Sequence, residues 1–170
     1  MTESVKRAKR TYDKLTRRIR AFNLPFFLAS WEEESLPPAA RPYRDKQLLE
    51  LSSMLYELQT GKSFKNAVEA LYAARDELDP VLRHEIENVK LSADKLAKVP
   101  KKEYLAYQNV ILDSYPAKFV KAKTTGDFSV VKPSLEKIIA YNRKYAEWEQ
   151  TESLKGYDVL LDEYEKGMTV

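Results

Sequence analysis

Apolar residues recur along the chain at the three- and four-residue steps of an α-helix. The first segment shows the pattern clearly, with apolar residues at Val5, Ala8, Tyr12, Leu15, Ile19 and Phe22. A short apolar segment begins at Pro25. A second stripe follows from about Tyr43 to Thr60 and consists of Leu48, Leu51, Leu55 and Leu58, widened by Leu49, Met54 and Tyr56. This spacing predicts amphipathic helices, the second with Gly61 as its C-cap.

Prolines and glycines mark the ends of further helices. Pro37, Pro38 and Pro42 predict a non-helical link, and Asp79-Pro80 reads as the N-cap and first residue of a helix. Its expected buried side holds Val81 or Leu82, Ile86, Val89 and Leu96. After Pro100, a helix from Glu103 to Lys123 is expected to bend at Pro116, and Thr124-Thr125-Gly126 closes its turn.

The last segments are also helical. Residues 127–133 lead into a helix with Leu135, Ile138 and Ile139, and residues 157–164 form a short final helix. We find no alternating run that would predict a strand. The sequence therefore predicts an all-α fold, a single helical domain over residues 1–170 with about seven helices.

Composition agrees with this fold. Of the 170 residues, 44% are hydrophobic and 32% are charged, and only four are glycine. No apolar run approaches the roughly 20 residues of a membrane-spanning helix. The chain has no cysteine, which excludes disulfides and thiolate chemistry, and its charged N-terminus lacks the apolar core of a secretory signal. The expected location is the cytoplasm.

Charge is concentrated at the N-terminus. The net charge is +3, but residues 1–20 carry eight Lys or Arg against Glu3 and Asp13. Such a helix could contact nucleic acid or an anionic membrane. Because its apolar stripe is a packing face and no nucleic-acid-binding motif accompanies it, we interpret the basic side as a solvated face. We expect neither nucleic acid nor membrane as a partner.

One stretch resembles part of a zinc site. Residues 83–88 read RHEIEN, and a zinc-peptidase helix carries H-E-x-x-H, in which two imidazoles bind the metal and the glutamate acts as base. Here Asn88 takes the fifth position, and His84 is the only histidine in the chain. We therefore interpret the stretch as an ordinary polar helical turn, and we expect no metal site.

Other catalytic patterns are also incomplete. The four glycines are too dispersed for a phosphate-binding loop, and no nucleophile pattern surrounds His84. Carboxylates gather at residues 32–34 and at Asp158, Asp162, Glu163 and Glu165. Such clusters are usually solvated faces, and the eleven tyrosines fall mainly at core positions of helices. The residues alone predict a helical module with no catalytic, cofactor-binding or metal-binding residue.

Two C-terminal motifs nevertheless resemble a known family. Residues 127–148, DFSVVKPSLEKIIAYNRKYAEW, and residues 157–169, YDVLLDEYEKGMT, are similar to segments of the thermostable (Taq-type) zinc carboxypeptidases. The matching residues are Phe128, Pro133, Leu135, Tyr157, Asp158, Leu160, Leu161, Asp162, Tyr164, Glu165, Gly167 and Thr169. A weaker match is WEEESLPP, residues 31–38. Departures from the family pattern are Glu32, Ser35, Pro37, Val131 and Lys166.

The resemblance covers roughly residues 15–170 and implies the N-terminal third of a zincin-type metallocarboxypeptidase. In that family the H-E-x-x-H helix lies beyond the final motif, so the resemblance assigns no zinc ligand, catalytic glutamate or substrate-binding arginine here. It implies a helical, bundle-like portion that walls a groove in enzymes that remove C-terminal amino acids from peptides with zinc. We expect this chain alone to be non-catalytic, with zinc only in a full-length member.

A different interpretation remains open. The chain could be a stand-alone module derived from that family, one that binds peptides or other proteins. Its partners would then be peptides, a second copy in a homodimer, or a missing catalytic segment. The motivation is the apolar stretch LPFFLASW, residues 24–31, which would lose a covering surface without the catalytic part.

Overall fold

The computed structural model describes residues 1–33 and 35–170, with the side chains of all of these except residues 114–116. Glu34, the last residue of the predicted acidic run, lies outside the described residues. The backbone divides into two compact units, Met1–Ala97 and Lys98–Val170. The described residues form helices and no strand, which confirms the all-α prediction. The single domain over residues 1–170 stays a prediction.

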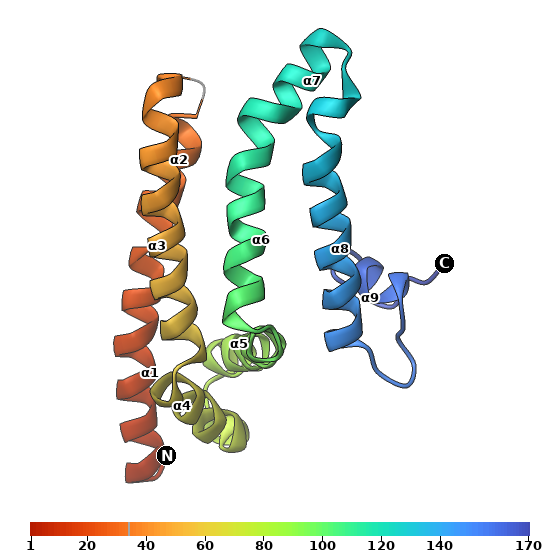
Figure 1. Cartoon of the computed structure of the whole chain (residues 1–170). Coiled ribbons are helices and arrows are strands. Elements are labelled where there is room, and N and C mark those ends of the chain that lie inside the picture. Colours follow the sequence, from red (N-terminus) through yellow and green to blue (C-terminus); the bar gives the residue numbers. More distant parts are fainter. Residues whose placement is uncertain (34) are drawn as a thin grey trace. The chain divides into compact units, whose positions relative to one another are not determined.

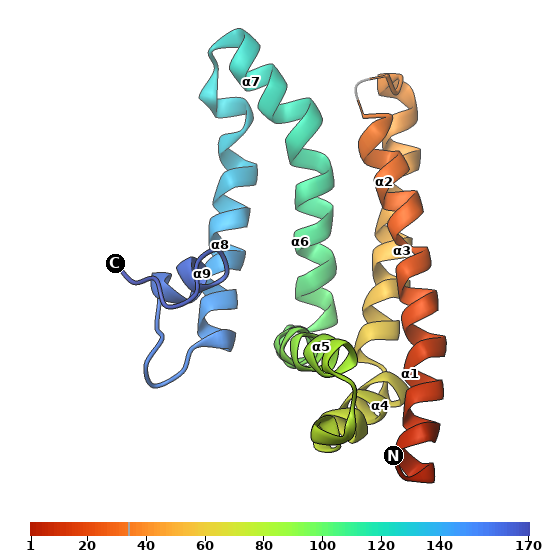
Figure 2. The same cartoon turned by 180° about the vertical axis from the view of Figure 1, so that it is seen from behind.

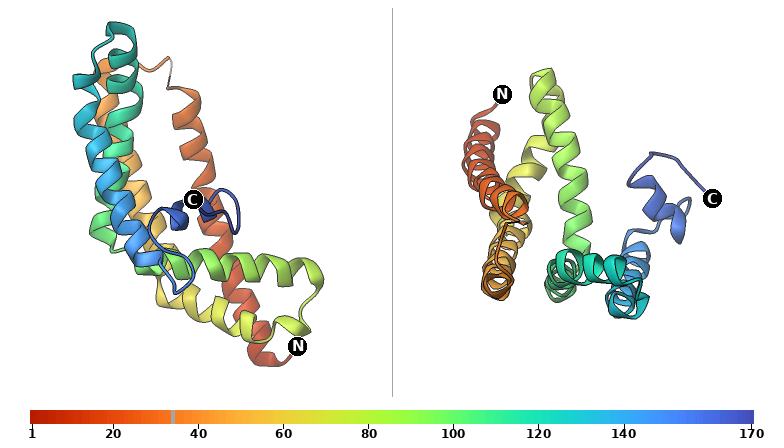
Figure 3. Two further views of the ribbon diagram at one scale, coloured as in Figure 1. Left: turned by 90° about the vertical axis from the view of Figure 1, so that its right-hand side faces the viewer. Right: turned by 90° about the horizontal axis from the view of Figure 1, so that it is seen from above.

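In its described residues, the first unit contains five α-helices and two 3-10 turns. The helices are α1 (Glu3–Ala21), α2 (Asn23–Trp31), α3 (Arg41–Thr60), α4 (Lys62–Ala73) and α5 (Pro80–Lys98), and the 3-10 turns are Pro38–Ala40 and Arg75–Glu77. α2 continues the direction of α1, and α3 returns antiparallel to them (Figures 1 and 2). α4 crosses the first half of α1, and α5 lies alongside α4 (Figure 3, left).

The core of this unit forms where α1, α4 and α5 meet. Its buried residues are Val5, Tyr12, Phe64, Ala67, Val68, Leu71, Leu78, Leu82 and Ile86, and Ala8, Leu15 and Ile19 pack against it. The predicted stripe of the N-terminal helix is therefore confirmed as a packing face. On α5 the choice between two predicted residues is also resolved, because Leu82 is buried whereas Val81 is 78% exposed.

The α3 helix differs from its prediction in two ways. It begins at Arg41, with Pro42 in its first turn, because a proline there loses no helical hydrogen bond. Its buried residues are Leu48, Ser52 and Tyr56, whereas Leu51, Leu55 and Leu58 are half-buried. Ser52 is accepted inside because its hydroxyl donates to the Leu48 carbonyl at 2.8 Å.

The second unit is a helical hairpin with an added short helix. Its α-helices are α6 (Lys101–Asp113), α7 (Val120–Thr125), α8 (Lys132–Glu149) and α9 (Tyr157–Asp162). α6 and α8 lie side by side and antiparallel, and α9 packs against α8 (Figure 1). A π-helical segment, Ser114–Phe119, separates α6 from α7, and it includes Pro116, where the helix Glu103 to Lys123 was expected to bend.

Two predicted turns have the expected geometry. The Asp79 carboxylate accepts the N–H groups of Val81 and Leu82 at 3.2 and 3.0 Å, which makes it the N-cap of α5. Gly126 ends α7 with φ 69°, a left-handed conformation that favours glycine. The 3-10 turn Phe128–Val130 then leads into α8.

Candidate functional site

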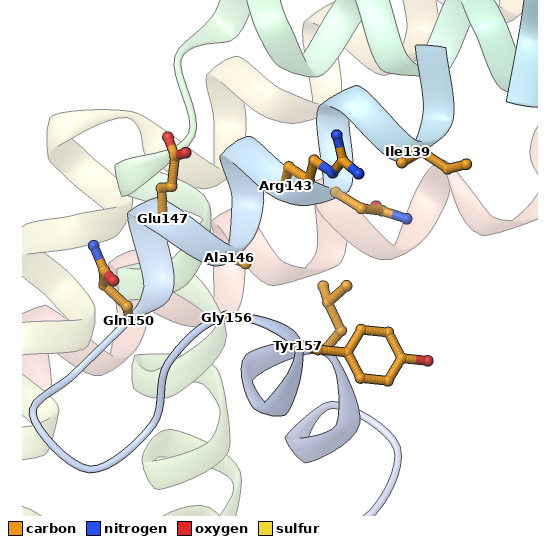
Figure 4. A pocket seen from close by; sticks show the side chains of 9 residues that line it. Ile139, Arg143, Ala146, Glu147, Gln150, Gly156 and Tyr157 are labelled. Atoms are coloured by element: carbon orange, nitrogen blue, oxygen red, sulfur yellow. The ribbon is translucent and has the colours of Figure 1, made fainter. Parts of the chain in front are cut away.

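The second unit carries an apolar groove between α8 and α9. It has a volume of about 520 Å³. One side is lined by Ile139, Asn142, Arg143, Ala146 and Glu147 of α8 and by Gln150, which caps its C-terminus, and the other side by Gly156, Tyr157 and Leu160. Figure 4 shows the α8 side chains above the Gly156–Tyr157 segment. Its size is in the usual range of ligand pockets, which are mostly apolar with a few polar groups.

A turn precedes α9, and its last residue, Gly156, lines the groove. The backbone N–H of Leu154 donates to the Thr151 hydroxyl at 3.1 Å, and Gly156 starts α9 with φ 57°. Because L-residues rarely adopt that conformation, glycine there allows the chain to turn directly into Tyr157. The Tyr157 side chain remains 63% exposed, so its ring is available at the groove's edge.

The C-terminal carboxylates stabilise a turn. Asp162 accepts the Gly167 N–H at 3.0 Å and pairs with Lys166 at 2.6 Å, and Asp158 accepts the Val170 N–H at 2.9 Å. The expectation of a merely solvated acidic face is thus too simple for these two residues, because their oxygens satisfy backbone donors. Glu165 is exposed, as expected.

Tyrosines pack the α6–α8 hairpin. The rings of Tyr107 and Tyr141 stack with centroids 4.0 Å apart, and Trp148 meets Tyr141 edge-on at 6.0 Å. Burial raises the pKa of Tyr145, and the nearby Glu163 carboxylate, which accepts its hydroxyl at 3.2 Å, raises it further. These rings therefore serve packing, in line with the prediction, whereas Tyr164 is 92% exposed.

The RHEIEN stretch lies on α5 of the first unit. The His84 ring is exposed and its Nε2 lies 3.0 Å from the Asn88 amide nitrogen. Glu85 accepts the Tyr12 hydroxyl at 2.7 Å and the Arg20 guanidinium at 3.0 Å. The Glu85 carboxylate, which occupies the position of the base in an H-E-x-x-H helix, instead links α5 to α1 through these two hydrogen bonds. Burial and this hydrogen bond raise the pKa of Tyr12 to about 12.

A cluster of ion pairs connects the link between α2 and α3 to the first turns of α3. Glu33 pairs with Arg41 and, at 2.6 Å, with Arg44, which also pairs with Asp45 at 2.9 Å. Burial alone would raise the pKa of Glu33, but hydrogen bonds from both guanidinium groups outweigh it, and the pKa lies below its usual value. Glu33, part of the predicted acidic run, is thus structural.

Sequence reasoning did not single out Glu149, a buried carboxylate at the end of α8. Its side chain is 4% exposed and pairs with Lys98 at 3.2 Å. Nothing in the local sequence distinguishes it from the exposed Glu147 one half-turn away, because only tertiary packing decides which of the two is covered. Within residues 1–33 and 35–170, no three His, Cys, Asp or Glu side chains are grouped so that they could hold a metal ion.

No helix in the described part of the chain has both the length and the apolar character needed to cross a membrane. The chain is similar to known proteins in sequence and in structure. Carboxypeptidase 1 of Bacillus subtilis (strain 168) is 28% identical over 166 residues, which cover 94% of this chain and 32% of the relative. A solved structure described as the BsuCP crystal structure aligns with a TM-score of 0.87 at 26% identity, covering 96% of this chain and 33% of its own.

The chain thus spans about a third of the length of the relative and of the solved structure. The sequence pattern of the family described as carboxypeptidase Taq (M32) metallopeptidase matches residues 11–170. That range begins inside α1, and it covers most of the first unit and all of the second. The resemblance in the two C-terminal motifs is therefore confirmed, and the chain belongs to the carboxypeptidase Taq (M32) family of metallopeptidases.

Proposed function

We propose that this chain is the helical front portion of an M32 metallocarboxypeptidase, one that shapes the substrate groove and supplies no catalytic group. The proposal rests on the contacts that His84 and Glu85 make, because His84 is the only histidine of the chain. Glu85 binds Tyr12 and Arg20, and His84 faces the Asn88 amide. An H-E-x-x-H site needs two imidazoles on one helical face and a free carboxylate.

Zinc bound in a full-length member would activate a water molecule for peptide hydrolysis. The residues of this chain would act on the substrate by shape. The groove between α8 and α9 offers apolar side chains such as Ile139 and Leu160 beside the amides of Asn142 and Gln150. Such a surface suits an extended peptide, because its apolar side chains and its backbone polar groups both find partners.

The same groove supports a second candidate function, a peptide-binding module that acts without the enzyme. The two candidates predict different partners for the chain but the same lack of hydrolysis. We also propose that the protein works in the cytoplasm. The chain has no cysteine, so its fold is independent of the reducing conditions there, and cell fractionation tests this location.

One experiment tests both functions. The purified chain is incubated with zinc and a fluorescent peptide, and mass spectrometry follows the peptide's C-terminus while anisotropy follows binding. The first proposal expects an intact peptide, and release of C-terminal residues by the chain alone contradicts it. Micromolar binding that weakens at least about tenfold in Ile139→Ser, but not in Val81→Ser, supports the peptide-binding module.

A further inference from the structure

The α2 helix presents an exposed apolar row, which we call the α2 stripe. It consists of Leu24, Phe27, Leu28 and Trp31, which are 62%, 59%, 49% and 78% exposed. Their spacing is i, i+3, i+4 and i+7, so all four lie on one face of the helix. The rings of Phe27 and Trp31 are 6.2 Å apart. This spacing is how amphipathic helices present anchors to an apolar groove.

The opposite side of α2 is apolar as well. Phe26 and Ala29 are half-buried on that side, and residues 23–31 include no charged side chain. None of these nine residues is fully buried. A helix with apolar residues on two opposite sides and no charged residue normally lies inside a protein, covered on both of those sides. The first unit covers one side of α2, and the α2 stripe therefore lacks its second cover.

Two possible covers fit poorly. A stable interface between two copies takes about 20 to 30 residues from each partner, and the α2 stripe offers four. A helix that lies on an anionic membrane normally carries Lys or Arg on its polar face, and residues 23–31 include neither. A segment of the same polypeptide needs less area, because covalent connection gives it a high effective concentration.

We propose that the α2 stripe is the docking surface for the polypeptide that corresponds to the remaining two-thirds of an M32 protein. Residues 11–170 match the family, yet the chain covers only 32% of the Bacillus relative. Most of that relative therefore lies outside the matched region. This inference rests on the proposed function, since it assigns the missing cover to the rest of the same enzyme.

The test uses a chimera and thiol labelling. Residues 1–170 replace the matching third of the Bacillus carboxypeptidase, with a single cysteine introduced as Leu24→Cys or Trp31→Cys. The control is Val81→Cys on α5, which replaces a residue that is also 78% exposed. A maleimide labels the folded protein, and mass spectrometry of peptides reads each position separately. We expect both α2 thiols to react at least about tenfold more slowly in the chimera than in the chain alone, and the control thiol to react equally in both.

Equal reaction of the α2 thiols in a folded chimera overturns the proposal. A second measurement on residues 1–170 alone does not depend on the chimera's folding. There the α2 thiols should react as fast as the control at every protein concentration and with anionic vesicles present. Protection by a second copy or by lipid overturns the inference. Peptide release by residues 1–170 would contradict the proposed function instead, so the two failures are distinguishable.

Discussion

At the scale of single residues, the molecule shows how environment decides what a carboxylate does. Glu85 stands beside the chain's only histidine, yet its partners are Tyr12 and Arg20 on another helix. Tyr12 is 2% exposed, and its hydroxyl therefore needs the acceptor that Glu85 supplies. The pair joins α1 to α5 at the edge of the core, which is a stabilising role.

This pair gives the first prediction. Replacing Tyr12 by Phe should lower the free energy of unfolding at neutral pH by about 1–2 kcal/mol, because a hydrogen bond to a charged acceptor is lost. The Tyr12 pKa is raised to about 12 from an ordinary 10.0, so its contribution is complete below pH 10. It declines as the pH rises through the folded value.

The stability difference between wild type and Tyr12→Phe should therefore shrink above pH 10. Urea denaturation at pH 7 and between pH 10 and 11.5 measures it. His84→Ala is the matched control, because the His84 ring is exposed and lies 3.0 Å from the Asn88 amide on the same helix. It should change stability by less than about 0.5 kcal/mol. A difference that grows with pH would contradict the assignment of the Tyr12 proton.

At the scale of elements, two helix ends use glycine for different reasons. Gly61 has φ −65° and ψ 144°, a conformation open to any residue, but an added Cβ would lie 2.8 Å from the Glu57 carbonyl oxygen. Gly126 has open space around it and a φ of 69°. At position 61 glycine is required because a Cβ would collide with the backbone, and at position 126 glycine is favoured because φ is positive.

The second prediction contrasts these positions. Gly126→Asn should cost less than about 1 kcal/mol, because asparagine tolerates the left-handed region. Gly61→Asn should cost about 1–3 kcal/mol, because the side chain collides with backbone whatever its polarity. Thermal unfolding by circular dichroism measures both variants. A Gly61→Asn protein as stable as wild type would show that the α3–α4 junction shifts without cost.

Sequence periodicity was sufficient for helices with a single clear stripe. In α1 the apolar spacing identified the side that packs, with Val5 and Tyr12 buried. In α3 leucines occur on several sides, and the choice of face was settled by the neighbouring helices, which cover Ser52 and Tyr56. Leu48 and Tyr56 were among the predicted residues. The burial of Ser52 was missed, because propensity and pattern carry no information about such neighbours.

The candidate site was less accessible from sequence. The motif residues Tyr157 and Leu160 were identified through the family resemblance, and both line the groove. Their partners on α8, such as Asn142 and Arg143, lie within the quoted segment 127–148 but are not among its matching residues. A groove between helices depends on how two helices pack, which the motif does not show. The exposure of Trp31 was expected only through the family resemblance, as part of a stretch that loses its cover without the catalytic part, because the pattern of apolar residues does not show which of them are covered.

At the scale of the whole molecule, the two compact units raise the question of cooperativity. The core of the first unit contains Ile86, which is 0% exposed. The third prediction is that Ile86→Ala lowers the free energy of unfolding by about 2–5 kcal/mol, through lost burial and the cavity left behind. Hydrogen exchange read by mass spectrometry measures this loss for each segment.

The predicted single domain gives this experiment a second outcome to check. If residues 1–170 unfold together, amides in Met1–Ala97 and in Lys98–Val170 should lose protection by the same free energy. A loss confined to the first unit would contradict the single-domain prediction. Val81→Ala is the control, because Val81 is 78% exposed and its truncation should leave both units unchanged within about 0.5 kcal/mol.

The π-helical segment Ser114–Phe119 determines where the α6–α8 hairpin can lose one residue without turning its buried side outward. A π-turn accommodates one residue more than the α-turn it replaces. Ala122, the buried residue of α7, thus keeps its inward direction although the chain upstream is one residue longer than a regular helix requires. Deleting one residue here would leave an uninterrupted helix with Ala122 still inside, whereas a deletion within α7 would rotate the exposed Lys121 or Lys123 inward by about 100°.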